Sequence, residues 1–377
     1  MPIHHFAFPT AIHFGAGARA LVRGHLRERG VHRPLLVTDR GLAALPILAQ
    51  FLATLDGLET AVYGGVFGNP TRDQVRAGVE AYRHHRADAV IGFGGGAALD
   101  VAKAVALMSV HDGDVMEYAW DHPKVRPIRA ELPYFVALPT TSGTGSEVGR
   151  SSVISDEKTH VKKVIFNPAL LARAVFADPE LTLDLPPGVT AATGMDALTH
   201  NVESYLSPAY HPLCDGIALE GARIAARSLA TAVAEPRNLA ARSDMMMSSM
   251  MGAIAFQKDL GAVHSCAHAL GTVVDMHHGL ANGIMIDHVM RFNAEAAGGR
   301  LAELARLCGA GSTPADFIAW LADLKARIGI PATLGAKGVT REHLPRLVEV
   351  AVADTCHQTN PRACSAADFE RIFQEAI

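Results

Sequence analysis

The sequence lacks the features of several protein classes. Its five cysteines are odd in number and include no Cys-x-x-Cys pair, which favours a reducing compartment over a disulfide framework. It has no apolar run of about 18 residues, so we expect no membrane span. Its formal net charge of −4 comes without a block of like charge, so we expect neither a nucleic-acid nor a membrane partner. The opening residues lack the basic and apolar regions of a signal peptide, and we expect a cytoplasmic protein.

What is present is enough apolar sequence for a large core. Hydrophobic residues make up 49% of the 377 residues and charged residues 19%, which is the balance of a globular chain. At about 150 residues per domain, the length suggests two domains.

The first half alternates short apolar runs with helical patterns. Strands are predicted over residues 34–38, 88–93 and 134–138, and helices over 73–85 and 98–108. Strands that alternate with helices indicate a parallel sheet covered on both faces.

The second half reads as helices only. Helical patterns follow the Pro186-Pro187 pair, over residues 187–205, 215–234, 240–256 and 300–308. We therefore predict an α/β nucleotide-binding domain, with a Rossmann-like parallel sheet, over residues 1–184 and an all-α metal-binding domain over 185–377.

Two loops of the first half suit a nucleotide. The run GFGGGAALDVAK at 92–103 follows a strand and opens a helix, where glycines and free N–H groups can approach a phosphate. Its spacing is not GxGxxG, and a tight turn is the alternative. The run LPTTSGTGSE at 138–147 follows another strand and is rich in hydroxyls, which suit phosphate or ribose; a solvated turn is its alternative.

Asp39 ends the first predicted strand. A carboxylate at this point of a nucleotide-binding domain can accept both ribose hydroxyls and would repel a 2′-phosphate, which favours NAD over NADP. The alternative is a helix N-cap, a common place for aspartate.

A cluster of metal-ligand residue types lies in the second half. Asp196 and His200 are four positions apart in a predicted helix, so they share one helix face. His264 and His268 have the same spacing in an apolar stretch, for which we expect Gly271 as the C-cap.

Two more histidines, His277 and His278, precede Gly279 in a predicted loop that leads into another helix. Four histidines within residues 264–278 favour a metal or proton-transfer site over satisfied core histidines. Three imidazoles and one carboxylate suit Fe, Zn or another first-row ion.

Taken together, these segments resemble the iron-containing (group III) alcohol dehydrogenases. The likeness runs from about residue 14 to residue 362 and rests on the order of GGGAALDVAK, LPTTSGTGSEV, FADPELT, GMDALTH, VHSCAHALG and HHGLANG. It implies NAD-dependent hydride transfer between a primary alcohol and its aldehyde. It also implies a divalent metal, Fe(II) with Zn(II) and Mn(II) as alternatives, a homo-oligomer, and an active site in a cleft between the two domains.

The resemblance also assigns residues. The implied metal ligands are Asp196, His200, His264 and His278, and His268 matches the histidine that serves proton transfer near the nicotinamide. The positions that match cofactor-binding ones are Asp39, Asn69, Gly95, Gly96, Ala97, Asp100, Thr140, Thr141, Thr144, Ser151 and Lys162.

Two departures from the family pattern bear on function. Ala97 replaces the usual serine after the glycines, which removes one hydroxyl to the pyrophosphate. Residues 256–261 read FQKDLG where relatives have a longer Asn/Ala-rich wall of the substrate pocket. Arg150 and Lys258 are candidates for binding a substrate carboxylate, and solvated surface charges are the alternative.

Three other functions stay open at this point. One is a polyol or semialdehyde dehydrogenase of the same fold with a carboxylated substrate. The second is a non-catalytic protein that binds NAD or metal. The third is a metal-dependent hydrolase, for which the nucleotide loops would have no purpose.

Overall fold

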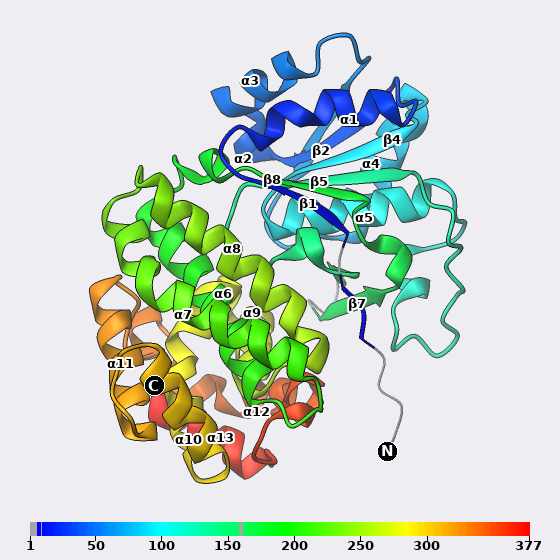
Figure 1. Cartoon of the computed structure of the whole chain (residues 1–377). Helices are drawn as coiled ribbons and strands as arrows, with labels where there is room; N and C mark the ends of the chain where they lie inside the picture. The colour runs from blue at the N-terminus through cyan, green and yellow to red at the C-terminus, as the bar shows by residue number, and fades with distance from the viewer. Residues whose placement is uncertain (1–5, 9, 158–160) are drawn as a thin grey trace. The chain divides into compact units, whose positions relative to one another are not determined.

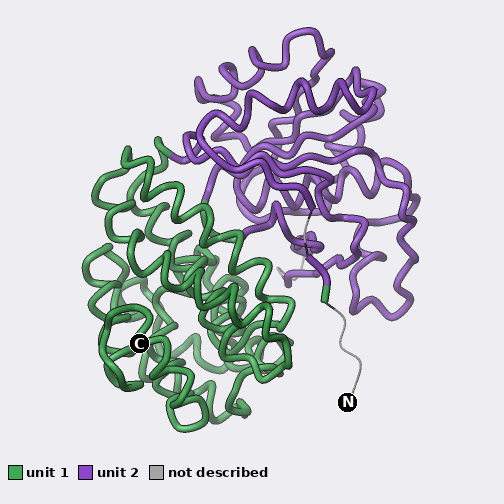
Figure 2. The backbone as a smooth tube through the Cα atoms, in the orientation of Figure 1, with its two compact units in different colours: residues 1–6, 142–144, 183–377 green, residues 7–141, 145–182 purple. Residues whose placement is uncertain are grey.

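The computed structural model in Figure 1 describes residues 6–8, 10–157 and 161–377. The chain divides into two compact units (Figure 2). The sheet unit comprises Ala7–Thr141 and Gly145–Thr182. The helical unit comprises Leu183–Ile377, together with Ser142–Thr144 and Phe6.

The sheet unit is built on a parallel sheet in the order β1-β8-β5-β4-β2-β3. Its central strand β4 is buried along its whole length, as expected where helices cover both faces of a sheet. The predicted parallel α/β architecture is confirmed. The strands are β1 (Ala11–Phe14), β2 (Pro34–Asp39), β3 (Ala61–Val66), β4 (Ala89–Gly94), β5 (Tyr134–Pro139) and β8 (Ala174–Ala177).

Helices cover both faces of this sheet (Figure 1). Val22 and Leu26 of α1 and Phe51 of α3 pack in one apolar cluster with Ile91 and Phe93 of β4, and α4 and α5 lie on the opposite face. An antiparallel hairpin, β6 (Ser151–Ser155) with β7 (Lys162–Phe166), is attached separately. The helices are α1 (Val22–Glu28), α2 (Arg40–Ala43), α3 (Pro46–Thr54), α4 (Arg72–His85) and α5 (Gly96–Ser109).

The helical unit has no strand among its described residues, and a single large apolar cluster forms its core. The predicted all-α second part is therefore confirmed. None of the described helices is long and apolar enough to cross a membrane. The helices are α6 (Pro187–Leu206), α7 (Pro212–Ala234), α8 (Leu239–Ala255), α9 (Ala262–Val274), α10 (His278–Leu307), α11 (Pro314–Arg327), α12 (Leu344–Ala353) and α13 (Ala366–Ala376).

Two local predictions in this unit are wrong. Gly271 lies inside α9 rather than capping it, because Val273 and Val274 still pack against the core. The helix ends instead at Asp275, which takes the left-handed conformation at φ 50°. His278 lies not in a loop but at the first position of α10, with His277 as the N-cap.

Candidate functional site

Helix α6 carries the first two candidate ligands. Asp196 and His200 lie one turn apart on the same face, and Asp196 Oδ1 is 3.8 Å from His200 Nε2. Both are buried in the apolar interior of the helical unit, with 2% and 4% exposure. Burying a carboxylate is costly without a compensating charge, so this position calls for a cation or a dense set of donors.

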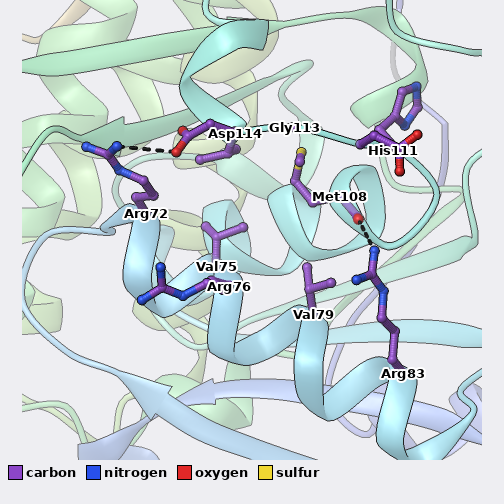
Figure 3. Close-up of a pocket in the computed structure, with 11 residues that line it drawn as sticks. Arg72, Val75, Arg76, Val79, Arg83, Met108, His111, Gly113 and Asp114 are labelled. Carbon is purple, nitrogen blue, oxygen red and sulfur yellow. Dashed lines mark hydrogen bonds and ion pairs between the residues drawn. The ribbon is translucent and has the colours of Figure 1, made fainter.

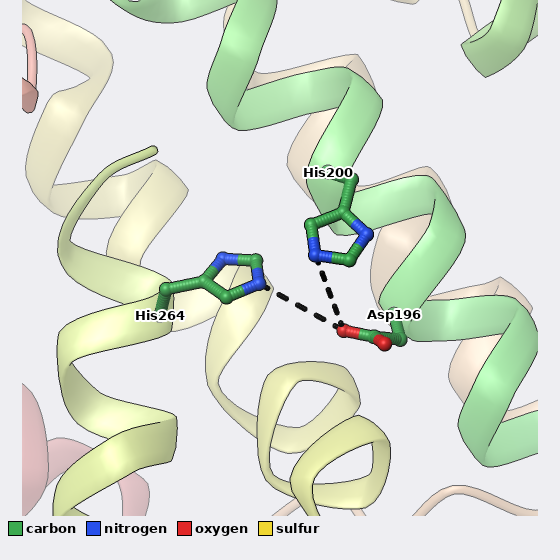
Figure 4. A group of neighbouring side chains, drawn as sticks. All are labelled: Asp196, His200 and His264. Carbon is green, nitrogen blue, oxygen red and sulfur yellow. Dashed lines mark ion pairs between the residues drawn. The ribbon is translucent and has the colours of Figure 1, made fainter. Parts of the chain in front are cut away.

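Helices α9 and α10 bring two more imidazoles to the same oxygen atom. His264 Nε2 lies 3.8 Å from Asp196 Oδ1 (Figure 4), and His278 Nε2 lies 3.5 Å from it. A side chain on Gly279 would place its Cβ 2.3 Å from Ala192 O in α6. The glycine after His278 therefore permits the close approach of α10 to α6.

The separations fit a metal ion. An ion with bonds of about 2.1 Å places neighbouring ligand atoms about 3.4 Å apart in tetrahedral geometry, close to the separations found here. The contacts of Asn282 support the same conclusion. Its amide Nδ2 lies 2.7 Å from Asp196 Oδ1 and 3.3 Å from both His264 Nε2 and His278 Nε2. The oxygen of Asp196 and the ring nitrogens of His264 and His278 therefore present their lone pairs to this one amide group. Asp196, His200 and His264 therefore form a metal site.

The surroundings of His264 and His200 leave each of these imidazoles with a ring nitrogen that can bind a metal ion. Glu203, with 2% exposure, accepts from His264 Nδ1 at 2.5 Å and from Val263 N at 2.7 Å. This fixes the proton on Nδ1 of His264 and leaves its Nε2 as the ligand atom. Burial lowers the pKa of His200 to about 4, so this imidazole is neutral at physiological pH and can donate a lone pair.

One side of the centre is open. The side chains of His268 and His278 are 26% and 24% exposed, and their rings stack at 5.3 Å. His264 and His268 both face this centre from α9, with their rings 6.1 Å apart. The imidazole of His268 therefore lies beside the open edge and is not needed to hold an ion.

Three contributors to this site were not identified from the sequence: Glu203, Asn282 and Asp354. Glu203 gave a usable signal, because a carboxylate three positions after His200 in an apolar helix needs a partner. Asn282 likewise lies one turn after His278. Asp354, which accepts from His268 Nδ1 at 2.7 Å, lies 86 residues away in the chain and gave no signal.

The sheet unit gathers several of the predicted cofactor residues at one edge. Asp39 ends β2, Gly95 follows β4 and Thr140 follows β5, and β4 lies between β2 and β5 in the sheet. The carboxyl ends of adjacent parallel strands are the usual place for a nucleotide. Gly95, Gly96 and Ala97 remain partly exposed, so the N-terminus of α5 is accessible to a phosphate.

Other cofactor candidates make contacts of their own. Asp39 accepts from Leu42 N at 2.9 Å as the N-cap of α2, which is the alternative considered for it, and its second oxygen does not take part in this bond. Asp100 is turned inward: Ser146 Oγ donates to Oδ1 at 2.6 Å and Val153 N donates to Oδ2 at 3.0 Å. Its carboxylate thus connects α5 to the segment before β6 and to β6 itself.

The remaining candidates lie in the connections and the hairpin. Asn69 lies between β3 and α4, and Thr141 lies within 3.3 Å of the position of a Cβ built on Gly95. Ser151 and Lys162 lie on β6 and β7, where the Ser151 carbonyl accepts from Lys103 Nζ.

The second predicted loop reaches α6 in the helical unit. Gly143 lies against Thr193, where a Cβ on the glycine would be 2.8 Å from the threonine Cβ. The segment Ser142–Thr144, which includes the cofactor candidate Thr144, therefore packs one turn from the metal-site residue Asp196.

A buried charge cluster lies behind the glycine-rich turn. Lys103 donates to Ser146 Oγ at 2.8 Å and lies 3.7 Å from Asp100 Oδ1. Burial lowers the pKa of Lys103 and raises the pKa of Asp100. Burial also raises the pKa of Glu147 to about 7. One buried cation thus faces two carboxyl groups, and burial favours the protonated form of both.

Glu147→Gln is expected to remove a pH dependence of stability. The folded state keeps a proton on Glu147 that the unfolded state loses above its pKa of 4.5, so stability falls as pH rises from about 4.5 to about 7. The shift corresponds to about 3 kcal/mol. Thermal unfolding at pH 5 and pH 8 should show the variant gaining stability over the parent chain at pH 8 only. An equal difference at both values would contradict the assignment.

Both predictions for Lys258, a substrate-binding cation and a solvated surface charge, are wrong. Lys258 is 1% exposed and its ammonium forms an ion pair with Asp215, so it is neither a solvated charge nor available to a substrate. Arg150 lies over the ring of Phe166 at 5.4 Å. Phe256, in the segment that departs from the family pattern, has its ring 5.2 Å from that of His200 and so borders the metal site.

A hollow of about 250 Å³ lies elsewhere in the sheet unit, between α4 and the loop after α5 (Figure 3). It contains none of the predicted cofactor or metal residues. Its arginines have partners: Arg72 pairs with Asp114 at 3.2 Å, and Arg83 donates to the Met108 carbonyl. Nothing in it assembles reactive groups.

Comparisons with known proteins agree with this geometry. Residues 9–179 match the model of the iron-containing alcohol dehydrogenases, and residues 190–377 match that of the family's C-terminal domain. The chain belongs to the iron-containing alcohol dehydrogenase family. As a member of this family it is an oxidoreductase, an alcohol dehydrogenase, which removes the hydrolase alternative.

Full-length relatives support the assignment. The chain is 38% identical to a 4-hydroxybutyrate dehydrogenase of Cupriavidus necator, over 98% of each protein. The crystal structure of a 1,3-propanediol oxidoreductase matches it with TM-score 0.95 and 35% identity over both full chains. A sulfoacetaldehyde reductase of Bifidobacterium kashiwanohense, solved with NAD+, matches with TM-score 0.93 and 29% identity, over 100% of this chain and 99% of that one.

Proposed function

We propose that the protein is an NAD-dependent alcohol dehydrogenase that interconverts short primary alcohols and their aldehydes at a divalent metal, with Fe(II) as the native ion. The observation that carries this proposal is the convergence of three imidazole Nε2 atoms on Asp196 Oδ1. Three neutral nitrogen ligands and one carboxylate suit Fe(II), with Zn(II) or Mn(II) as substitutes.

The proposed mechanism gives a role to each of five residues of the chain. We assign Asp196, His200, His264 and His278 as the four ligands. A divalent ion supplies Lewis acidity toward an alcohol or carbonyl oxygen when it is bound. His268, beside the open edge, accepts the hydroxyl proton during oxidation and returns it during reduction. The hydride goes from the carbinol carbon to C4 of the nicotinamide.

NAD is the proposed cofactor on two grounds. The relative solved with NAD+ shares the whole fold, and Asp39 stands at the end of β2, where a carboxylate accepts ribose hydroxyls and disfavours a 2′-phosphate. We assign phosphate binding to the N-terminus of α5, at Gly95, Gly96 and Ala97, and to the hydroxyls of Thr140 and Thr141. The backbone donors serve there in place of the serine hydroxyl that Ala97 lacks.

The proposed substrates are three- and four-carbon alcohols with a second polar group. The support comes from relatives that act on 4-hydroxybutyrate and 1,3-propanediol. Because Lys258 is neutralised by Asp215, it does not bind a substrate carboxylate.

A substrate comparison tests this proposal. We expect kcat/KM for 4-hydroxybutyrate or 1,3-propanediol to exceed that for 1-butanol by at least about 10-fold, the scale of one recognised polar group. NAD should be preferred to NADP. Equal values for all three alcohols would reject the bifunctional substrate, and a preference for NADP would reject the role of Asp39.

A further inference from the structure

A carboxylate that the metal does not need lies behind His268. Asp354 follows α12 as its C-cap, and its Oδ2 accepts from His268 Nδ1 at 2.7 Å. Its other oxygen, Oδ1, accepts from Ser265 Oγ at 2.7 Å and from Cys356 N at 2.9 Å. One oxygen is thus held by two donors, and the other is left for the imidazole.

The aspartate is ionised. Burial by itself raises the pKa of Asp354, but His268, the Ser265 hydroxyl and the Cys356 amide together outweigh it and hold the pKa well below its usual range. An ionised carboxylate can only accept hydrogen bonds. The proton on the imidazole must therefore lie on Nδ1, and Nε2 of His268 carries a lone pair.

The imidazole is also held in place. Its ring stacks on that of His278 at 5.3 Å and 19°, and Ser265 lies one helical turn away on α9, where its Oγ also accepts from His357 N at 2.9 Å. Asp354 and the stacked ring fix both the tautomer and the orientation of His268. The same carboxylate–imidazole pairing prepares histidine bases in unrelated enzymes.

We propose that Asp354 is a positioning residue that keeps His268 in the tautomer with a proton on Nδ1, so that Nε2 can take the proton of the substrate hydroxyl. This rests on the proposed role of His268. In oxidation, the O–H bond breaks and its proton goes to Nε2 and then to solvent. The carbinol C–H bond breaks with its electron pair, which reduces the nicotinamide at C4.

A second ion is the competing explanation for this cluster. Ligand atoms of His268, Asp354 and Cys356 lie within 4.8 Å of one another. However, both oxygens of Asp354 already accept hydrogen bonds. Burial also raises the pKa of the Cys356 thiol well above its usual value, and a neutral thiol is a poor ligand. A proton-transfer role therefore fits better than a second metal site.

The decisive variant is Asp354→Asn. The amide can donate to Nδ1 of His268 and so favours the opposite tautomer, with the proton on Nε2. We expect kcat to fall by about 100-fold or more, with KM for the alcohol, NADH affinity and metal content unchanged. In a His268→Ala background, the same substitution should change kcat by less than about 2-fold, because coupled residues are not additive.

Asp368→Asn is the matched control. Asp368 also accepts from a serine hydroxyl and a backbone amide, Ser365 Oγ at 2.6 Å and Ser365 N at 3.0 Å, but it has no histidine partner among the described contacts. The Asp368→Asn variant should be less stable than the parent chain but should keep its turnover. Metal content, NADH fluorescence titration and melting temperature are measured for every variant.

The outcomes distinguish a failure of the proposed role of His268 from a failure of the positioning role of Asp354. If His268→Ala keeps full kcat, the proposed role of His268 itself is wrong. If His268→Ala is impaired but Asp354→Asn is not, or lowers kcat equally in both backgrounds, the positioning role is wrong. Two ions per chain, with one lost in Asp354→Asn, would overturn the inference in favour of a second metal site.

Discussion

His264→Ala is expected to abolish metal retention and to lower kcat by about 1,000-fold or more, which is the scale of losing roughly 4 kcal/mol of Lewis-acid stabilisation. The side chain of His264 is 2% exposed and supplies one of the three Nε2 atoms that surround Asp196 Oδ1. Its loss also leaves Glu203 buried without its imidazole partner. Metal analysis after dialysis and the rate of NADH formation measure the two effects.

His277→Ala is the control for this prediction. His277 is adjacent to the proposed ligand His278 but acts as the N-cap of α10, accepting from Leu280 N at 3.4 Å. Its variant should keep metal and turnover and lose only about 1 kcal/mol of helix stability. Metal and activity that survive in His264→Ala would reject the ligand set, and their loss in His277→Ala would reject the choice between the two adjacent histidines.

Glu203→Gln should weaken metal binding by about 10- to 100-fold, the usual effect of losing a partner that orients a ligand. The carboxylate accepts from His264 Nδ1 and from two amides in the first turn of α9, Val263 N and His264 N. A glutamine keeps one carbonyl oxygen, which can accept from the Val263 amide, and its Nε2 can donate to Nδ1 of His264 and move the imidazole proton to Nε2, where the ion should bind.

A chelator competition measures this change without relying on activity. Glu220→Gln provides the matched control, because Glu220 lies on α7, is 44% exposed and pairs only with Arg223 among the described contacts. An affinity for the ion in Glu203→Gln within about 2-fold of the parent chain would show that the tautomer of His264 is not set by Glu203.

Helical spacing explains why half of the site could be predicted. Asp196 with His200, and His264 with His268, are i and i+4 pairs, and any regular helix places them on one face. That the two faces meet depends on contacts between helices far apart in sequence. Glu203 reaches His264 across 61 residues and Asp354 reaches His268 across 86, and spacing within one helix carries no information about such contacts.

The fold was predictable where local signals agree with the final structure. Strand β5 is an apolar run without glycine and is predicted from the sequence, whereas β3 contains Gly64 and Gly65, which weaken a strand signal. In α10, Gly283, Gly298 and Gly299 lower helix propensity; the sequence predicts a helix after Gly279 but indicates bounds only for its last turns. Packing against α6 and α11 stabilises the rest of that helix.

The most direct test of a metal-dependent NAD alcohol dehydrogenase is to remove and restore the ion. Chelated apo-protein would be reloaded anaerobically with Fe(II), Zn(II) or Mn(II), and NADH formation from 1,3-propanediol would be recorded together with metal content. We predict no turnover without metal and a rate that rises with bound ion to one ion per chain, highest with Fe(II). Equal NADH formation in apo- and reloaded protein would contradict the account.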